Sequence, residues 1–282
     1  MWNEITISGF ADEIDASLDK QTEVLKKLNI NYVEMRGVNG KGLVEYSVAE
    51  AKEIKKQLDA SGIRLSSVGS PIGKIQITDA FEPHLELYKH TIEIAHLMEV
   101  PYIRMFSFFM PEGESYEPYR TKVMDQLGQF VDGAKSGGVV LLHENEKDIY
   151  GDTAPRCLEL METFYGEHFK AVFDFANFVQ CQQDTLEAYE MLKSYIAYVH
   201  IKDARWSDAG VVPAGMGDGN VAAILKMIKD SGYQGFLSLE PHLSDFDGFS
   251  ALEQNAAQKK KLSGEEAFTL AYESLMKILE RL

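Results

Sequence analysis

Cysteine is scarce in this 282-residue sequence, which contains only Cys157 and Cys181 and has no CxxC motif. A disulfide framework and a thiolate metal site are therefore not indicated. Apolar runs of about 18 residues, the length expected of a membrane-spanning helix, are also missing. The first residues, Met1 to Glu4, lack the basic and apolar regions of a signal peptide. We therefore expect a cytoplasmic protein that has no membrane as a partner.

Basic residues are also few, since 28 Lys and Arg stand against 44 Asp and Glu and give a net charge of -16. Binding a nucleic-acid backbone requires clustered cationic side chains that displace counterions. The one basic cluster in the sequence, Lys259 to Lys261, stands in a polar stretch and is most simply a solvated surface. Nucleic acid is therefore not an expected partner. We expect a small-molecule ligand, and the sequence is compatible with a homo-oligomer.

The glycine-rich marker of dinucleotide-binding sheets is absent too. The segment from Gly215 to Gly219 contains three glycines, but it follows an irregular loop and lacks the GxGxxG spacing. We favour a flexible surface loop for this segment. The alternative is a loop that shapes the seventh strand-to-helix connection of a barrel, where phosphate often binds at a helix N-terminus.

The sequence does contain a strand followed by a helix, eight times over. The predicted strands cover 5–9, 32–36, 63–68, 102–106, 139–144, 171–174, 196–200 and 236–240. The predicted helices cover 17–28, a segment from 47 onward, 81–98, 116–135, 155–164, 185–193, 221–229 and 265–282. One α/β barrel commonly needs about 250 residues, and no linker divides the chain. We therefore predict a single (β/α)8 TIM barrel over residues 1–282.

Each of four consecutive predicted strands ends at an acidic or imidazole side chain: Glu144, Asp174, His200 and Glu240. The apolar runs before them are typical of buried parallel strands, whose carboxyl ends meet at one face of a barrel. Taken singly, an Asp or Glu at such a position is more often a helix cap or a solvated charge, and a single His is more often a structural residue. None is followed directly by its predicted helix, so four separate caps are a poor account. Three carboxylates and an imidazole suit one hard divalent ion, and we predict Mn²⁺, Mg²⁺, Co²⁺ or Zn²⁺.

Further polar residues are expected at the rim of the same face. Strand alternation and the strand ends indicate Glu34, Arg36, Arg104, Glu146, Lys202 and His242, with Arg205 in the loop that follows the seventh strand. Each is as consistent with a structural ion pair as with a substrate contact. The cationic members suggest a locally positive mouth that holds a phosphate or carboxylate. His143 has the opposite alternation to Glu144, so we expect it to face the helices.

At these strand ends the chain resembles the xylose-isomerase-like sugar isomerase/epimerase superfamily, over essentially its whole length. The motifs are LHENE at 142–146, FDFANF at 173–178, VHIKD at 199–203 and LEPH at 239–242. The resemblance implies that the four residues bind one divalent metal and that Glu144 and Glu240 flank the substrate as acid/base groups. Ketose 3-epimerases of this superfamily carry His in place of Asn177 and an Asn-Arg pair after the first glutamate. Endonuclease IV relatives need additional histidines, which the loop from 205 to 220 lacks.

The function that we predict is a metal-dependent isomerase or epimerase acting on a keto-sugar, sugar phosphate or related polyol. One glutamate removes the proton α to a carbonyl and the other delivers a proton to the resulting enediolate. A metal-dependent lyase or dehydratase on a keto-sugar or keto-inositol is the alternative, and a non-catalytic sugar-binding barrel is another. The predicted substrate-binding residues are Arg104, Asn177, Lys202 and Arg205.

Overall fold

Eight parallel strands form a nearly closed barrel in the computed structural model, which describes residues 2, 5–243 and 261–282. The barrel strands are β1 (Thr6–Gly9), β2 (Tyr32–Met35), β5 (Arg64–Gly69), β6 (Tyr102–Met105), β7 (Val140–Glu144), β8 (Phe169–Asp174), β9 (Ile196–Ile201) and β12 (Phe236–Leu239). Their hydrogen-bonded order is β1-β12-β9-β8-β7-β6-β5-β2. β1 and β2 lie next to each other and complete the ring. The predicted (β/α)8 TIM barrel is confirmed.

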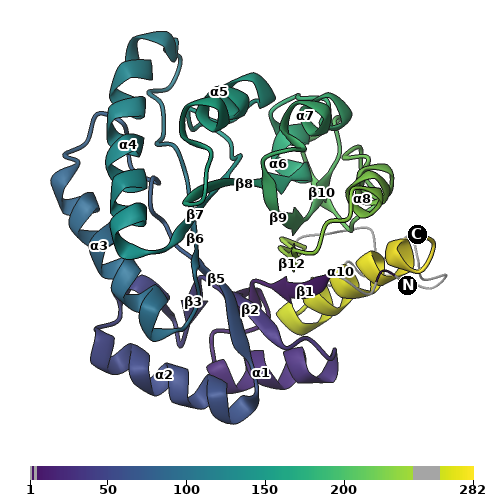
Figure 1. Cartoon of the computed structure of the whole chain (residues 1–282). Helices are drawn as coiled ribbons and strands as arrows, with labels where there is room; N and C mark the ends of the chain where they lie inside the picture. Colours follow the sequence, from purple (N-terminus) through teal and green to yellow (C-terminus); the bar gives the residue numbers. More distant parts are fainter. Residues whose placement is uncertain (1, 3–4, 244–260) are drawn as a thin grey trace.

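The helices form an outer ring around these strands (Figure 1). They are α1 (Leu18–Lys27), α2 (Val48–Ser61), α3 (Glu82–Leu97), α4 (Arg120–Gly137), α5 (Ala154–Phe164), α6 (Phe175–Gln180), α7 (Thr185–Leu192), α8 (Val221–Asp230) and α10 (Gly264–Leu279). Every predicted helix is present, whereas the short α6 directly after β8 was not predicted. No described helix is long and apolar enough to cross a membrane.

Local sequence signals explain where several helices begin and end. Ser47 caps α2 in a capping box with Glu50, as the spacing of serine and glutamate predicts. Gly62 ends the same helix in the left-handed conformation, with φ +73°, which a side chain with a Cβ rarely adopts. The third lysine of the basic cluster, Lys261, precedes α10, whereas Lys259 and Lys260 lie outside the described residues.

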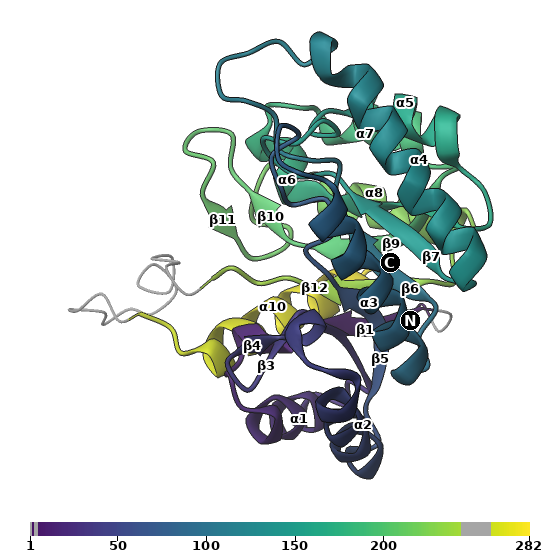
Figure 2. The ribbon, with the colours of Figure 1, turned by 90° about the vertical axis from the view of Figure 1, so that its left-hand side faces the viewer.

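The barrel interior is arranged in layers that follow the two-residue period of its strands. Leu142, Val172 and Tyr198 form a buried apolar cluster inside the barrel. Each stands two residues before a predicted metal ligand, so the ligand layer lies directly above it on the same inward face. Two short hairpins, β3–β4 (Gly37–Val38 and Lys41–Gly42) and β10–β11 (Asp203–Ala204 and Val211–Val212), stand at that end of the barrel (Figure 2).

Candidate metal centre

The four predicted ligands meet at the carboxyl ends of the barrel strands. Glu144, Asp174, His200 and Glu240 each offer an atom within 4.8 Å of the atoms offered by the others, and all four side chains are buried. Glu144 and Asp174 are the last residues of β7 and β8, His200 lies near the end of β9, and Glu240 follows β12. The convergence expected from four strand ends is therefore present.

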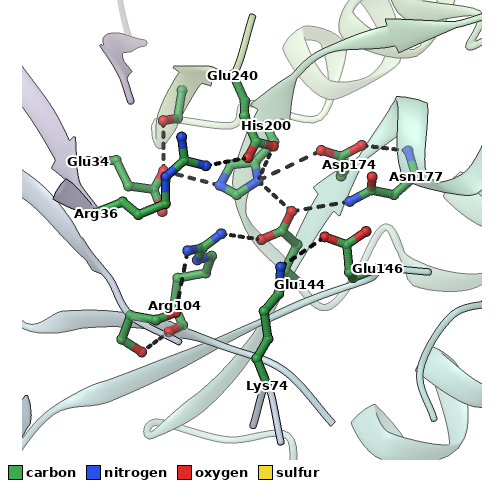
Figure 3. A network of polar contacts seen from close by, with 12 residues as sticks. Glu34, Arg36, Lys74, Arg104, Glu144, Glu146, Asp174, Asn177, His200 and Glu240 are labelled. Atoms are coloured by element: carbon green, nitrogen blue, oxygen red, sulfur yellow. Dashed lines mark hydrogen bonds and ion pairs between the residues drawn. The ribbon is translucent and has the colours of Figure 1, made fainter. Parts of the chain in front are cut away.

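His200 lies at the centre of this cluster and is held on both sides of its ring (Figure 3). Its Nδ1 atom is 3.1 Å from Oε1 of Glu144, and 3.8 Å from both Oδ2 of Asp174 and Oε2 of Glu240. The Nε2 atom lies 3.1 Å from Oε2 of Glu34. The rings of Phe10 and Tyr198 pack edge-on against the imidazole. The ring orientation therefore directs Nδ1 toward the carboxylates.

Asp174 divides its two oxygens between a structural contact and the cluster. Its Oδ1 atom accepts the backbone N–H of Asn177 at 2.7 Å and caps the N-terminus of α6. Asn145 exchanges two hydrogen bonds with the backbone of Asp174, both 2.9 Å long. These contacts leave Oδ2 facing His200. The premise that no ligand directly precedes a helix is thus wrong for Asp174, because one carboxylate both caps a helix and joins the cluster.

The donor set fits a divalent cation. Oδ2 of Asp174 and Nδ1 of His200 are buried and lack a hydrogen-bond partner of suitable geometry. Buried polar atoms without partners are rare, because the loss of hydration costs about 1–3 kcal/mol for each group. Three carboxylates and one imidazole are a ligand combination that Mn²⁺, Co²⁺ and Zn²⁺ accept, and the carboxylates also suit Mg²⁺. A cation at the cluster would complete the coordination of both atoms.

Three cationic side chains contact the carboxylates: the two arginines at the oxygens that point away from His200, and Lys202 at oxygens that face it. Arg104 is buried and donates to Oε2 of Glu144 at 3.0 Å. Lys202 donates to Oε2 of Glu240 at 2.8 Å, and its Nζ lies 3.2 Å from Oδ2 of Asp174. Arg36 lies 3.3 Å from the other oxygen of Glu240. The two guanidinium groups also lie over the buried ring of Phe10, at 4.8 Å for Arg36 and 5.1 Å for Arg104.

Burial and the neighbouring charges shift the pKa values of the carboxyl groups in the cluster strongly. Burial opposes ionisation of Glu144, but the nearby His200 and Arg104 outweigh it and lower its pKa to about 2. Burial likewise opposes ionisation of Glu240, whose pKa nevertheless falls well below its usual range because of Lys202, His242 and His200. Burial raises the pKa of Asp174 to about 6, despite the proximity of Lys202. Both glutamates are therefore ionised at neutral pH, which is the form that binds a metal or accepts a proton.

The remaining predicted site residues occupy different surroundings. Asn177 donates from its side chain to Oε1 of Glu144 at 3.2 Å and belongs to the cluster. Arg205 is exposed and pairs with Asp208 in the loop after β9, away from the four ligands. His242 is also partly exposed, with Nε2 3.4 Å from Oε1 of Glu240. His143 lies outside the cluster, as predicted, and contacts Oγ of Ser107 at 3.0 Å.

Two contacts of the site were not predicted from the sequence. Glu34 was expected at the rim, but it is fully buried and accepts hydrogen bonds from His200 and from Oγ of Ser238 at 2.7 Å. Its signal is a carboxylate inside the otherwise apolar run of β2, where a buried charge requires a partner. Lys74 is a further case, because its loop before α3 brings Nζ to 3.2 Å from Oε2 of Glu146. No strand pattern marks that contact.

Comparison with known proteins places the chain in a family. A family model described as the xylose isomerase-like TIM barrel matches residues 22–270, and the chain therefore belongs to this family. No curated protein sequence matches the chain.

Solved structures of low sequence identity share the same fold. The probable 3-DHS dehydratase AsbF of Bacillus anthracis is similar with a TM-score of 0.73 and 15% identity, covering 96% of this chain and 99% of that chain. The 3-keto-D-glucoside 4-epimerase YcjR of E. coli has a TM-score of 0.68 and 15% identity, covering 98% of each chain. The IolI protein with a bound zinc atom has a TM-score of 0.75 and 17% identity, covering 98% of this chain and 99% of that chain. At these identities the likeness shows the shared barrel fold.

Proposed function

We propose that this protein is a divalent-metal-dependent isomerase or epimerase that acts on a keto-sugar, a sugar phosphate or a related polyol. The observation that carries the proposal is the arrangement of the two glutamates. Glu144 and Glu240 approach His200 from different strands, and each directs one oxygen toward the cluster and the other toward an arginine. Two ionised carboxylates on separate sides of one buried point suit proton transfer on two faces of a substrate.

The roles of the chain's own residues follow from these contacts. Glu144, Asp174, His200 and Glu240 would hold the metal, which when bound supplies Lewis-acid stabilisation to a carbonyl and the adjacent hydroxyl. One glutamate accepts the α proton on a carboxylate oxygen. The other first takes up a proton, from solvent or, for Glu240, from the Lys202 ammonium 2.8 Å away, and then delivers it to the opposite face. Arg104 and Lys202, buried against these carboxylates, keep each glutamate oriented and supply hydrogen-bond donors to substrate oxygens. Asn177 adds a donor beside Glu144, and Arg205 acts from the loop above.

A lyase is the second candidate, and the likeness to a probable dehydratase supports it. Its first step is the same removal of the α proton. The outcome then depends on whether the substrate carries a leaving group on the β carbon. The Lys202 ammonium, 2.8 Å from Glu240, is a buried donor that suits protonation of a departing hydroxyl.

The deciding experiment is proton exchange in D₂O. The metal-loaded protein is incubated with a panel of keto-sugars, keto-inositols and sugar phosphates, and α-deuteration and new products are followed by NMR. Exchange that requires both added metal and Glu144 supports the proposal, and the products distinguish an epimer, an isomer and a dehydrated compound. Tight binding without any exchange or product would contradict an enzymatic role and favour a sugar-binding barrel.

A further inference from the structure

The glycine-rich loop before α8 is built around the carboxylate of Asp203. This side chain is buried and accepts four backbone N–H groups at 2.9–3.0 Å. The donors are Ala204, Gly215, Gly217 and Gly219. Such a ring of inward-pointing N–H groups is the usual backbone site for an anion. Here the anion is part of the chain.

The glycines are required by this close packing. A Cβ atom at Gly217 would lie 2.5 Å from Oδ1 of Asp203, and one at Gly219 would lie 2.7 Å from the same oxygen. Both distances are shorter than real Cβ contacts, and the opposing atom belongs to a buried carboxylate rather than to a flexible surface group. The loop is therefore shaped to wrap the carboxylate of Asp203.

The loop that surrounds Asp203 lies at a position where TIM barrels often bind phosphate. β9 is the seventh strand of the barrel, and the loops after the seventh and eighth strands of TIM barrels frequently form a site for a substrate phosphate. A phosphate would bind there through the same N–H groups that Asp203 already occupies. A phosphate group brought to this loop would also meet the negative charge of that carboxylate.

The cations around the metal cluster do not supply a free positive charge that would offset the repulsion between Asp203 and a phosphate. Arg36 forms a hydrogen-bonded ion pair with Asp12, and its guanidinium lies within 3.4 Å of Glu13 and Glu240. Arg104 is paired with Glu144, Lys202 with Glu240 and Asp174, and Lys74 with Glu146. The carboxylates of this group outnumber its cations, so that one divalent ion does not make the net charge of the site positive. Each cation near the ligands thus already faces a carboxylate.

From these two observations, and resting on the proposed function, we infer that the substrate is an uncharged polyhydroxy carbonyl compound without a phosphate group. The dense set of paired carboxylates, ammonium and guanidinium groups offers donors and acceptors to hydroxyl groups. It offers no unneutralised positive charge to an ester phosphate. The sequence predicts a positively charged entrance to the site, formed by Arg36, Arg104, Lys202 and Arg205. Because these cations are paired with carboxylates, we infer that the entrance carries no excess positive charge.

The inference is tested with matched pairs of ligands on the metal-loaded protein. The pairs are D-fructose with its 6-phosphate and D-tagatose with its 6-phosphate. Two quantities are measured for each, the α-proton exchange rate in D₂O and the shift of the melting temperature caused by the ligand. Because like-charge juxtaposition costs several kcal/mol, exchange at low substrate concentration should be faster by about tenfold or more for the neutral member. The neutral member should also give the larger melting shift.

The outcomes separate the inference from the proposed function. Faster exchange or a larger melting shift with the phosphorylated members overturns the inference and leaves the proposed function intact. Melting shifts with the neutral members but no exchange support the inference about ligand charge and contradict the proposed enzymatic function. If neither member of either pair binds or exchanges, the comparison is extended to the keto-sugars and keto-inositols of the wider panel, and both are wrong if no member of that panel binds or exchanges.

The Asp203 contact has its own test. In an Asp203→Ala variant the four N–H groups lose their anion, so inorganic phosphate should raise the melting temperature of the variant and leave the wild type unchanged. Asp218→Ala is the matched control, because Asp218 lies in the same loop and, within the described residues, its carboxylate accepts a single backbone N–H, that of Trp206 at 2.7 Å. An equal response of the wild type and Asp203→Ala to phosphate would overturn the inference. A folded Asp203→Ala protein whose melting temperature does not change with phosphate would also overturn the inference. If that variant does not fold, the matched ligand pairs decide.

Discussion

Oε2 of Glu34 lies 3.1 Å from Nε2 of His200, on the side of the imidazole opposite the candidate metal position. A carboxylate at this position accepts the Nε2 proton, so that Nδ1 is the nitrogen left to face Glu144, Asp174 and Glu240. The contact is buried on all sides, because both side chains are fully excluded from solvent. Glu34 therefore acts through His200, as a positioning residue for the ligand cluster.

The first prediction is that Glu34→Gln weakens metal binding by about 10–100-fold, which is the usual effect of losing such a supporting carboxylate. The amide keeps the size of the side chain but removes the charge that orients the imidazole. Affinity is measured by competition with a chelator, using Mn²⁺ and Zn²⁺. The ring nitrogen shifts of His200, measured by NMR, should also move in the metal-loaded variant, which a merely structural change would not produce.

Ser238→Ala is the control for this prediction. Ser238 donates to the same oxygen of Glu34, and although it is the neighbour of His200 across β12 and β9, no hydrogen bond joins its side chain to any of the four ligands in the described part of the chain. Its replacement should leave the metal affinity close to that of the wild type. If Glu34→Gln and Ser238→Ala change the affinity equally, Glu34 has no special role in orienting His200.

The second prediction concerns His200 itself. Replacing it with Ala removes the nitrogen donor at the centre of the cluster and leaves only carboxylates, so metal affinity should fall further than in Glu34→Gln. His143→Gln provides the comparison, because His143 is buried one residue from Glu144 but lies outside the cluster. Elemental analysis that finds stoichiometric metal in dialysed His200→Ala protein would rule out the assignment.

The third prediction separates ligand from acid/base roles. Glu144→Gln and Glu240→Gln each keep an oxygen that can bind a metal, but the amide cannot accept a proton. Metal affinity should fall only in part, whereas α-proton exchange should fall by about 10²–10⁴-fold, the usual value of a positioned acid or base. Because the two residues act on opposite faces, one variant should still exchange the proton of one epimer without interconverting the pair. Near-normal turnover by both metal-loaded variants would mean that another base acts.

The four candidate ligands can be found in the sequence because strand alternation and the polar end of an apolar run are local features. Glu144 and His200 stand on the same inward face as Leu142 and Tyr198, two residues earlier, and the fold then brings the strand ends together. The contacts of long side chains are not local. The sequence marks Arg104 and Lys202 as cations at strand ends, but only the assembled barrel shows which carboxylate each one contacts.

The loop before α8 illustrates the same limit. Its glycines predict a flexible surface loop, with a phosphate-binding loop as the alternative. Neither interpretation includes the buried carboxylate of Asp203, which stands two residues after the end of β9 and accepts hydrogen bonds from loop glycines 12 to 16 residues away in the sequence. A carboxylate that binds backbone N–H groups leaves no periodic pattern, because its partners are main-chain groups, here of one alanine and three glycines.

The last prediction concerns pH and stability at the loop between β5 and α3. Nε2 of His84 accepts the N–H of Gly73 at 2.7 Å, and burial lowers the pKa of His84 below its ordinary value of 6.5. Only the neutral imidazole can accept this hydrogen bond, and the position near the N-terminus of α3 also disfavours a positive charge. As the pH falls below about 6.5, the unfolded chain binds a proton at His84 that the folded protein resists, so the free energy of unfolding should decrease.

His84→Gln keeps an acceptor oxygen without a titrating group, and it should flatten this part of the stability profile between about pH 5 and 8. Denaturant unfolding across that range measures the slopes, and comparison at pH 8 separates any packing cost of the substitution from the proton effect. Equal slopes for the wild type and His84→Gln would show that His84 titrates alike in the folded and unfolded states.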